Sequence, residues 1–214
     1  MNTEITRQRK KKPAVFILES NSLTNEYDSE FEGEALSRIL HLSRIESQYF
    51  YFRTKKELKE LLEEFKLIKY RYLHIACHGD ETSMATTFDE ISFDKLAEIL
   101  KPNVANRRLF FSACSMTNIN LARAVFSKAR PYSIMGPAQD LYFSEAAVFW
   151  AGFYTVMLLE NRSMSKERIL TNARNLASSF GLDFNYFGRD NSQQRGFTTP
   201  TIRRSQPNKI ERNR

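Results

Sequence analysis

The sequence predicts an α/β domain in which helices cover both faces of a mainly parallel sheet. Short apolar runs typical of buried strands alternate with longer amphipathic segments at helical spacing. Two of these runs end in residues that can do chemistry, Ala76-Cys77-His78-Gly79 and Ser112-Ala113-Cys114-Ser115. A chain of 214 residues, of which 42% are hydrophobic, is long enough for one such domain with its own core.

The expected elements follow from these patterns in chain order. Strands are expected at residues 14–18, 48–52, 70–77, 107–113 and 132–135. A capping box formed by Thr54 and Glu57 predicts the start of one helix. The other helices are expected at residues 30–42, 93–100, 118–128, 141–160 and 165–180.

One of the expected helices is unusually apolar. Residues 141–159 carry a single charge, Glu145, over a length close to that of a membrane span. The segment also contains Ser144, Gly152 and Thr155, and it lies within the continuing alternation of strands and helices. We therefore expect a helix buried against the sheet, and no membrane partner.

The net charge of +7 lies in the two ends of the chain. Residues 1–12 carry +4 and residues 189–214 carry +5, which leaves −2 for the part between. We expect a domain at 13–188 between two basic, flexible tails, with nucleic acid as a partner only through these tails. Only two cysteines, Cys77 and Cys114, and no visible signal peptide favour a reducing cytoplasm.

The strongest functional pattern is a cysteine and a histidine at two strand ends. Parallel strands end at the same edge of a sheet, where ligands of open α/β sheets bind. Cys114 can therefore act as a nucleophile that His78 activates as a general acid/base. The backbone N–H groups of Gly79 and Cys114 are the expected oxyanion donors, because a residue without a Cβ lets a substrate carbonyl approach closely.

Other residues near the pair are expected to be structural. Cys77 alternates to the opposite face from His78, and His74 lies four residues inside the strand. Both are therefore expected in the core. A zinc site built from these residues lacks paired-ligand spacing, so neither a metal nor another cofactor is expected.

Segments 72–79 and 109–115 resemble the His-Gly and Ala-Cys motifs of caspase-like cysteine peptidases, and the chain is most similar to their CHAT family. The likeness continues through residues 91–96 and 134–154 and covers about residues 13–188. It implies a caspase-like three-layer α/β/α sandwich, with His78 as general acid/base, Cys114 as nucleophile and the Gly79 N–H in the oxyanion hole.

The resemblance also implies a place for substrate recognition. In caspase relatives, the pocket for the residue before the scissile bond is lined from the end of the first strand and from the segment after the cysteine strand. Glu19 and Asp140 stand at those places, and acidic side chains there would select arginine or lysine. Two other interpretations stay open: Asp140 as the cap of a helix near residue 141, and Glu19 as a solvated carboxylate.

The expected function is therefore that of a cysteine endopeptidase which cleaves a partner protein after arginine or lysine. The family resemblance implies a regulated effector, for example in antiviral (antiphage) defence. No part of the chain is left for a sensor domain, so a separate regulatory or sensor protein is an expected partner. The alternative is an inactive caspase-like binding or scaffold module that acts through its surface or its basic tails.

Overall fold

The computed structural model describes residues 12–159 and 164–203. Within these residues the strands form one ten-stranded sheet, whose main path runs β10-β8-β7-β6-β3-β1-β2. The strands are β1 (Lys12–Ser20), β2 (Ser47–Tyr51), β3 (Tyr70–Gly79), β4 (Ser83–Ala85), β5 (Glu90–Ser92), β6 (Arg108–Ser112), β7 (Ser133–Pro137), β8 (Phe184–Arg189), β9 (Phe197–Thr198) and β10 (Thr201–Ile202).

The centre of the sheet is parallel and one side is antiparallel. Strand β1 pairs in parallel with β2 and β3, and β3 continues through β6 to β7. Strand β8 runs antiparallel to β7 and carries β9 and β10. A small hairpin of β4 and β5 extends the carboxyl end of β3. The carboxyl ends of the five parallel strands therefore share one edge.

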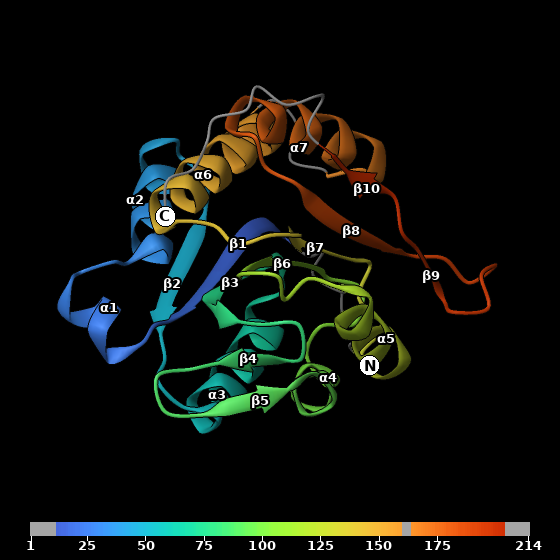
Figure 1. Cartoon of the computed structure of the whole chain (residues 1–214), viewed down its shortest axis with the longest axis horizontal. Helices are drawn as coiled ribbons and strands as arrows, with labels where there is room; N and C mark the ends of the chain where they lie inside the picture. Colours follow the sequence, from blue (N-terminus) through green and yellow to red (C-terminus); the bar gives the residue numbers. More distant parts are fainter. Residues whose placement is uncertain (1–11, 160–163, 204–214) are drawn as a thin grey trace, which may run out of the picture.

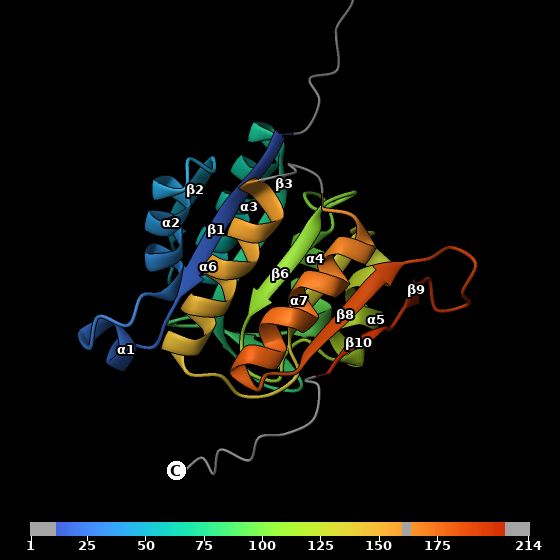
Figure 2. The same cartoon turned by 90° about the horizontal axis from the view of Figure 1, so that it is seen from above.

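The helices form one layer on each face of the sheet. They are α1 (Leu23–Tyr27), α2 (Glu32–Leu42), α3 (Lys55–Ile68), α4 (Phe93–Leu100), α5 (Ile119–Lys128), α6 (Phe143–Leu159) and α7 (Lys166–Phe180). Figure 1 shows α6 and α7 above the sheet and α3, α4 and α5 below it, and Figure 2 shows α2 beside α6. The predicted three-layer α/β/α sandwich with a mainly parallel sheet is confirmed.

Local signals in the sequence fix several helix ends. The Thr54 hydroxyl accepts from the Glu57 N–H, and the Glu57 carboxylate accepts from the Thr54 N–H, so the predicted capping box is present. The Asn118 side chain caps α5, and the Ser165 side chain caps α7. Helix α7 ends at Gly181, whose positive φ of 65° suits a residue without a Cβ.

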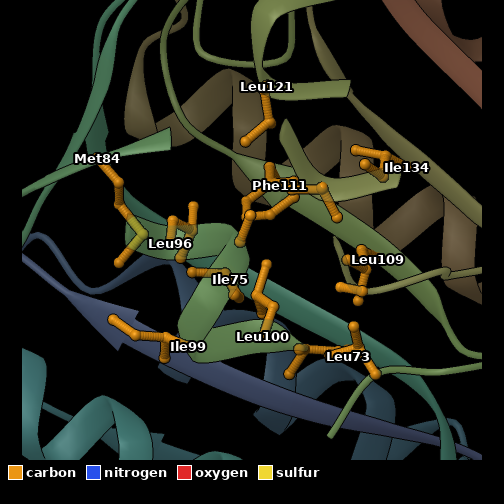
Figure 3. Packing of buried hydrophobic residues seen from close by; sticks show 14 of the residues in the cluster. Leu73, Ile75, Met84, Leu96, Ile99, Leu100, Leu109, Phe111, Leu121 and Ile134 are labelled. Atoms are coloured by element: carbon orange, nitrogen blue, oxygen red, sulfur yellow. The ribbon is translucent and has the colours of Figure 1, made fainter. Parts of the chain in front are cut away.

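Two buried clusters hold the three layers together. Alternating side chains of β3 enter opposite clusters, Leu73 and Ile75 on one face and Tyr72 on the other. Figure 3 shows the first cluster, in which Leu96 and Leu100 of α4 pack against the sheet. Within the described part of the chain, the second cluster takes eight of its 24 buried side chains from α6, more than from any other element, and eight of the 24 are aromatic.

Helix α6 is apolar because it lies between the sheet and other helices. Trp150, Phe153 and Tyr154 have no exposed surface, and the helix contacts α2 and α7. Among the described residues, every helix is too short or too polar to cross a lipid bilayer. The expectation of a helix buried against the sheet is met.

The expected C-terminal tail needs a correction up to residue 203. Strand β8 ends at Arg189, and β9 and β10 then pair one after the other with the edge of β8 that faces away from β7. Phe197 and Ile202 are fully buried and join the two core clusters. Burial of these two apolar side chains explains why a basic segment continues the sheet. The remainder of the two predicted tails, 1–11 and 204–214, lies outside the described residues.

Gly136 in β7 shows how closely the chain after β6 packs on the sheet. A Cβ at this position would overlap Thr117 Oγ1 and would stand 2.6 Å from the carbonyl oxygen of Phe111. The turn that follows the cysteine strand therefore depends on a residue without a side chain.

We expect Gly136→Ala to lower the free energy of unfolding by about 1–3 kcal/mol or more, because backbone must move to admit the methyl group. Urea unfolding followed by circular dichroism measures this change. Gly152→Ala is the control, since its Cβ would meet Leu176 Cδ2 at an ordinary 3.5 Å and alanine stabilises a helix interior by about 0.5–1 kcal/mol. Equal stability of Gly136→Ala and wild type would contradict the packing described.

Candidate active site

The register of two neighbouring strands brings the predicted pair together. Strands β3 and β6 are parallel, and Ala76 stands opposite Ser112. Two residues further along each chain come His78 and Cys114. Both line the same pocket at the carboxyl edge of the sheet. The placement predicted from the sequence is the one that the structure has.

This pocket lies between the strand ends and the beginning of α6. It has a free volume of about 340 Å³, its open mouth included. Its wall is formed by Glu32, Cys77, His78, Ser112, Ala113, Cys114, Leu141, Tyr142, Phe143 and Ala146. Four segments far apart in the sequence thus meet here, namely α2, the end of β3, the end of β6, and the segment that enters α6.

His78 is held by a polar side chain that the sequence analysis did not identify. Its Nε2 lies 2.7 Å from Asn25 Oδ1 in α1. The Asn25 Nδ2 donates to Glu30 Oε2 at 2.5 Å, which fixes the orientation of the amide and leaves Oδ1 to accept from the imidazole. Nε2 therefore carries the proton, and Nδ1 is unprotonated. Desolvation by burial lowers the pKa of His78, so the ring is neutral near pH 7.

The thiol of Cys114 is directed at the segment before α6. Its Sγ donates to the carbonyl oxygen of Leu141 across 3.8 Å. Burial raises the pKa of Cys114, and the nearby Asp140 carboxylate adds to this effect. The next residue, Ser115, has a positive φ of 49°, which turns the chain sharply after the cysteine. The predicted pair in this structure is therefore an uncharged thiol and an uncharged imidazole that line the same pocket.

Gly79 lies at the end of β3, where it pairs with Met84 of β4. A Cβ there would come within 3.0 Å of Met116 Sδ and 3.1 Å of the Ser83 carbonyl oxygen. The missing side chain thus lets the turn after Cys114 pack on β3. The oxyanion role of the Gly79 and Cys114 N–H groups stays a prediction.

Glu19 is placed away from the candidate pocket. Its carboxylate is fully buried and accepts from the N–H groups of Gly33 and Glu34 at 2.8 and 3.2 Å. The Tyr49 hydroxyl donates to the same carboxylate at 2.8 Å. Desolvation raises the pKa of Glu19 while these hydrogen bonds oppose the rise. The carboxylate therefore binds the first turn of α2, and the prediction that it binds a substrate cation gains no support.

Asp140 is exposed and lies beside the mouth of the site. Its Oδ1 accepts from the Ser115 hydroxyl at 3.1 Å, and its charge acts on Cys114. The residue is not part of the pocket wall. Helix α6 begins at Phe143, three residues beyond Asp140, and the Glu145 carboxylate accepts from the Tyr142 N–H at its start.

His74 and Cys77 were both expected in the core, and they differ in how far they are buried. His74 is fully buried, with Nδ1 3.2 Å from the Tyr154 hydroxyl. Burial lowers the pKa of His74 to about 3, so the ring is neutral. Cys77 is only half-buried and packs against the cluster on the opposite face from His74. Burial raises the pKa of its thiol as well.

Glu32 is a second residue of this site, after Asn25, that sequence reasoning missed. It is 5% exposed, and its Oε2 accepts from the Ser112 hydroxyl at 2.9 Å. The Trp150 indole N–H donates to the same hydroxyl at 3.0 Å. Desolvation raises the pKa of Glu32 to about 8. In the sequence, Glu32 resembles any acidic residue in the first turn of a helix.

The described residues contain no group of three or more histidine, cysteine or acidic side chains arranged to hold a metal ion. The chemistry that this site can perform rests on the thiol, the imidazole and the buried carboxyl.

Comparisons with known proteins support the fold. No family model matches the sequence, and no curated protein matches it either. Among solved structures, a secreted C11 cysteine protease from Bacteroides thetaiotaomicron, iotapain, is similar with a TM-score of 0.54 at 11% identity over 84% of this chain and 67% of its own. Caspase-1 from Spodoptera frugiperda is similar with a TM-score of 0.53 at 13% identity over 90% and 85% of the two chains. The chain therefore has a caspase-like fold.

The raised pKa of Cys114 predicts slow alkylation at neutral pH. In Cys77→Ser protein, we expect the rate of reaction with iodoacetamide to rise with pH, with a midpoint above the ordinary thiol value of about 8.5. Intact mass measured over time gives the rate. Asp140→Asn should move the midpoint downward, because it removes a negative charge that disfavours the thiolate. A midpoint at or below pH 7 would show that the thiol is already activated.

Proposed function

We propose that this protein is a cysteine endopeptidase with His78 and Cys114 as its catalytic dyad. The observation that carries this proposal is that both side chains line one pocket at the ends of adjacent parallel strands. The caspase-like fold supports it, since two solved cysteine proteases share that fold. The family-level part of the proposal, membership of the CHAT type, rests on the resemblance of segments 72–79 and 109–115.

The reaction follows from the two neutral groups. His78 Nδ1 takes the proton from Cys114 as Sγ attacks the carbonyl carbon of the scissile bond. The carbonyl electrons move to oxygen, and the Gly79 and Cys114 N–H groups are the proposed donors that stabilise the charge. The C–N bond then breaks, and the imidazolium gives its proton to the leaving amine. Water, deprotonated by His78, hydrolyses the thioester and restores the thiol.

Asn25 completes this arrangement as a positioning residue. Its Oδ1 accepts a hydrogen bond from the Nε2–H of His78, and its Nδ2 donates a hydrogen bond to Glu30. This fixes the tautomer in which Nδ1 is the basic nitrogen, as removal of the proton from the Cys114 thiol requires. Asn25 does not touch the reacting atoms, so it acts on the rate through the imidazole.

The finer parts of the proposal concern substrate and control. Cleavage after a basic residue fits a site whose ionisable neighbours are mostly acids, with Asp140 at the mouth and Glu32 in the wall. The hydrogen bond from Cys114 to the Leu141 carbonyl supports control by a separate regulatory protein, because the nucleophile is engaged by its own chain. A role as an effector in antiphage defence rests on the family resemblance alone.

The test of the proposed activity is cleavage of a peptide library by wild type, Cys114→Ala and His78→Ala. We expect both variants to lose about 1,000-fold or more of the rate, because each removes a group on which the covalent step depends. His41→Ala, an exposed histidine of α2 outside the pocket wall, is the matched control and should keep its rate. Equal rates for wild type and Cys114→Ala would remove the proposed nucleophile and favour an inactive binding module.

The positioning role of Asn25 predicts a second result. Asn25→Ala should lower kcat by about 10- to 100-fold with little change in KM, because a misplaced imidazole costs rate and not binding. Asn25→Asp should restore much of kcat and move the acidic limb of the pH profile upward, since a carboxylate raises the pKa of His78. Thr24→Ala, exposed on the same helix, is the control. An unchanged kcat in Asn25→Ala would refute the role.

A further inference from the structure

Glu32 presents a buried carboxyl with one oxygen unused. Its Oε2 is bound by Ser112, but Oε1 has no hydrogen-bond partner among the described residues. The nearest basic atom is Nε2 of His74, 3.7 Å away and beyond hydrogen-bond distance. A buried polar atom without a partner costs about 1–3 kcal/mol. Oε1 has almost no exposed surface in this structure, but Glu32 lines the pocket, so a ligand that displaces the packing over this oxygen can bind it.

The pocket that Glu32 lines is the one that holds the dyad. When Cys114 attacks, the residue before the scissile bond becomes attached to Sγ through its carbonyl carbon. The Cα that carries the side chain of this residue is bonded directly to that carbon. A pocket that opens beside Sγ therefore receives that side chain. Ser112 and Ala113, the two residues before the cysteine, line the same pocket, and the Ser112 hydroxyl binds Glu32.

We propose that Glu32 is the specificity-determining residue, and that its carboxylate binds the ammonium group of a lysine before the scissile bond. This inference rests on the proposed peptidase function and names the substrate side chain of the same site. Glu32 lies at the start of α2, so it belongs neither to the end of the first strand nor to the segment after the cysteine strand.

The geometry favours lysine over arginine. Arginine binds carboxylates with two parallel N–H groups and needs both oxygens. Here Oε2 is already occupied by the Ser112 hydroxyl, which is itself held by the Trp150 indole. A single free oxygen matches the point charge of an ammonium group.

The two acids predicted from the sequence fit this role less well. Glu19 uses both carboxylate oxygens on the first turn of α2 and on Tyr49. Asp140 is exposed, where water competes for a charge-assisted bond and weakens it. Of the three acids, only Glu32 is both buried and part of the pocket wall.

Binding of a cation is coupled to loss of a proton. With a pKa of about 8, the Glu32 carboxyl is protonated at neutral pH, and an arriving ammonium group releases that proton to solvent. The preference for lysine over a neutral side chain should therefore grow from pH 6 to about pH 8. The polar and ionisable groups that face the carboxyl from the packed elements are Glu19 of β1, His74 and Cys77 of β3, Ser112 and Cys114 at β6, and Trp150 and Tyr154 of α6.

The test uses peptidyl acyloxymethyl ketones that differ only in the residue next to the reactive carbonyl, namely lysine, arginine, norleucine, glutamine or aspartate. Norleucine matches the length of the lysine chain but carries no charge. Intact mass gives the rate at which each probe modifies Cys114 of the full chain. We expect lysine to react about tenfold or more faster than norleucine, and faster than arginine.

Two variants locate the effect. Glu32→Gln keeps an acceptor for Ser112 and should abolish the advantage of lysine over norleucine while norleucine still reacts. Glu34→Gln removes a charge from the same helix outside the pocket and should leave the ratio unchanged. Asp140→Asn should change the ratio by less than Glu32→Gln does. Circular dichroism before labelling shows whether Glu32→Gln folds.

The outcomes separate the two proposals. If no probe modifies Cys114 while iodoacetamide still alkylates it, the proposed peptidase function fails. If the probes react but norleucine, glutamine or aspartate reacts as fast as lysine in wild type, the role of Glu32 fails and the dyad stands. Survival of the lysine preference in folded Glu32→Gln also overturns the inference. The wild-type comparison decides the question even where Glu32→Gln does not fold.

Discussion

The parallel pairing of β3 with β6 is the interaction on which the candidate site depends. Ala76 stands opposite Ser112, and side chains alternate between the two faces of a sheet. A slip of one residue would therefore turn His78 and Cys114 toward opposite faces. Apolar side chains on both faces of the two strands hold the register, and the indole of Trp150 adds a hydrogen bond to Ser112. The geometry of the dyad is thus a consequence of core packing.

The parts of this structure that local patterns encode could be predicted from the sequence. Apolar runs and caps predicted the alternating strands and helices, and the strand ends predicted where His78 and Cys114 would lie. The partners of polar side chains could not be predicted in this way. Asn25 and His78 are 53 positions apart, and Glu32 and Ser112 are 80 positions apart. Such contacts depend on how the layers of the domain pack together, and the sequence of a single segment does not indicate that packing.

Glu19 and Glu32 show what decides the role of a buried acid. Both glutamates lie at the first turn of α2, Glu32 as its first residue and Glu19 from β1, and burial raises the pKa of both. Glu19 accepts from the backbone of Gly33 and Glu34 and from Tyr49, so both of its oxygens are used. Glu32 has one such bond and one oxygen without a partner. The two residues are of the same type, and they differ in how many hydrogen-bond donors reach their carboxylate oxygens.

Burial moves the pKa values of the dyad in opposite directions and keeps both groups neutral. It lowers the pKa of His78 and raises that of Cys114, so proton transfer from thiol to imidazole is unfavourable before a substrate binds. The thiol also donates to the Leu141 carbonyl, in the segment that forms one wall of the pocket. In the proposed reaction, a substrate that enters between this segment and the strand ends must displace that carbonyl to reach Sγ. The proposal thus makes one segment both a wall of the pocket and a restraint on Cys114, so that substrate recognition and activation of the thiol are coupled in the proposed mechanism.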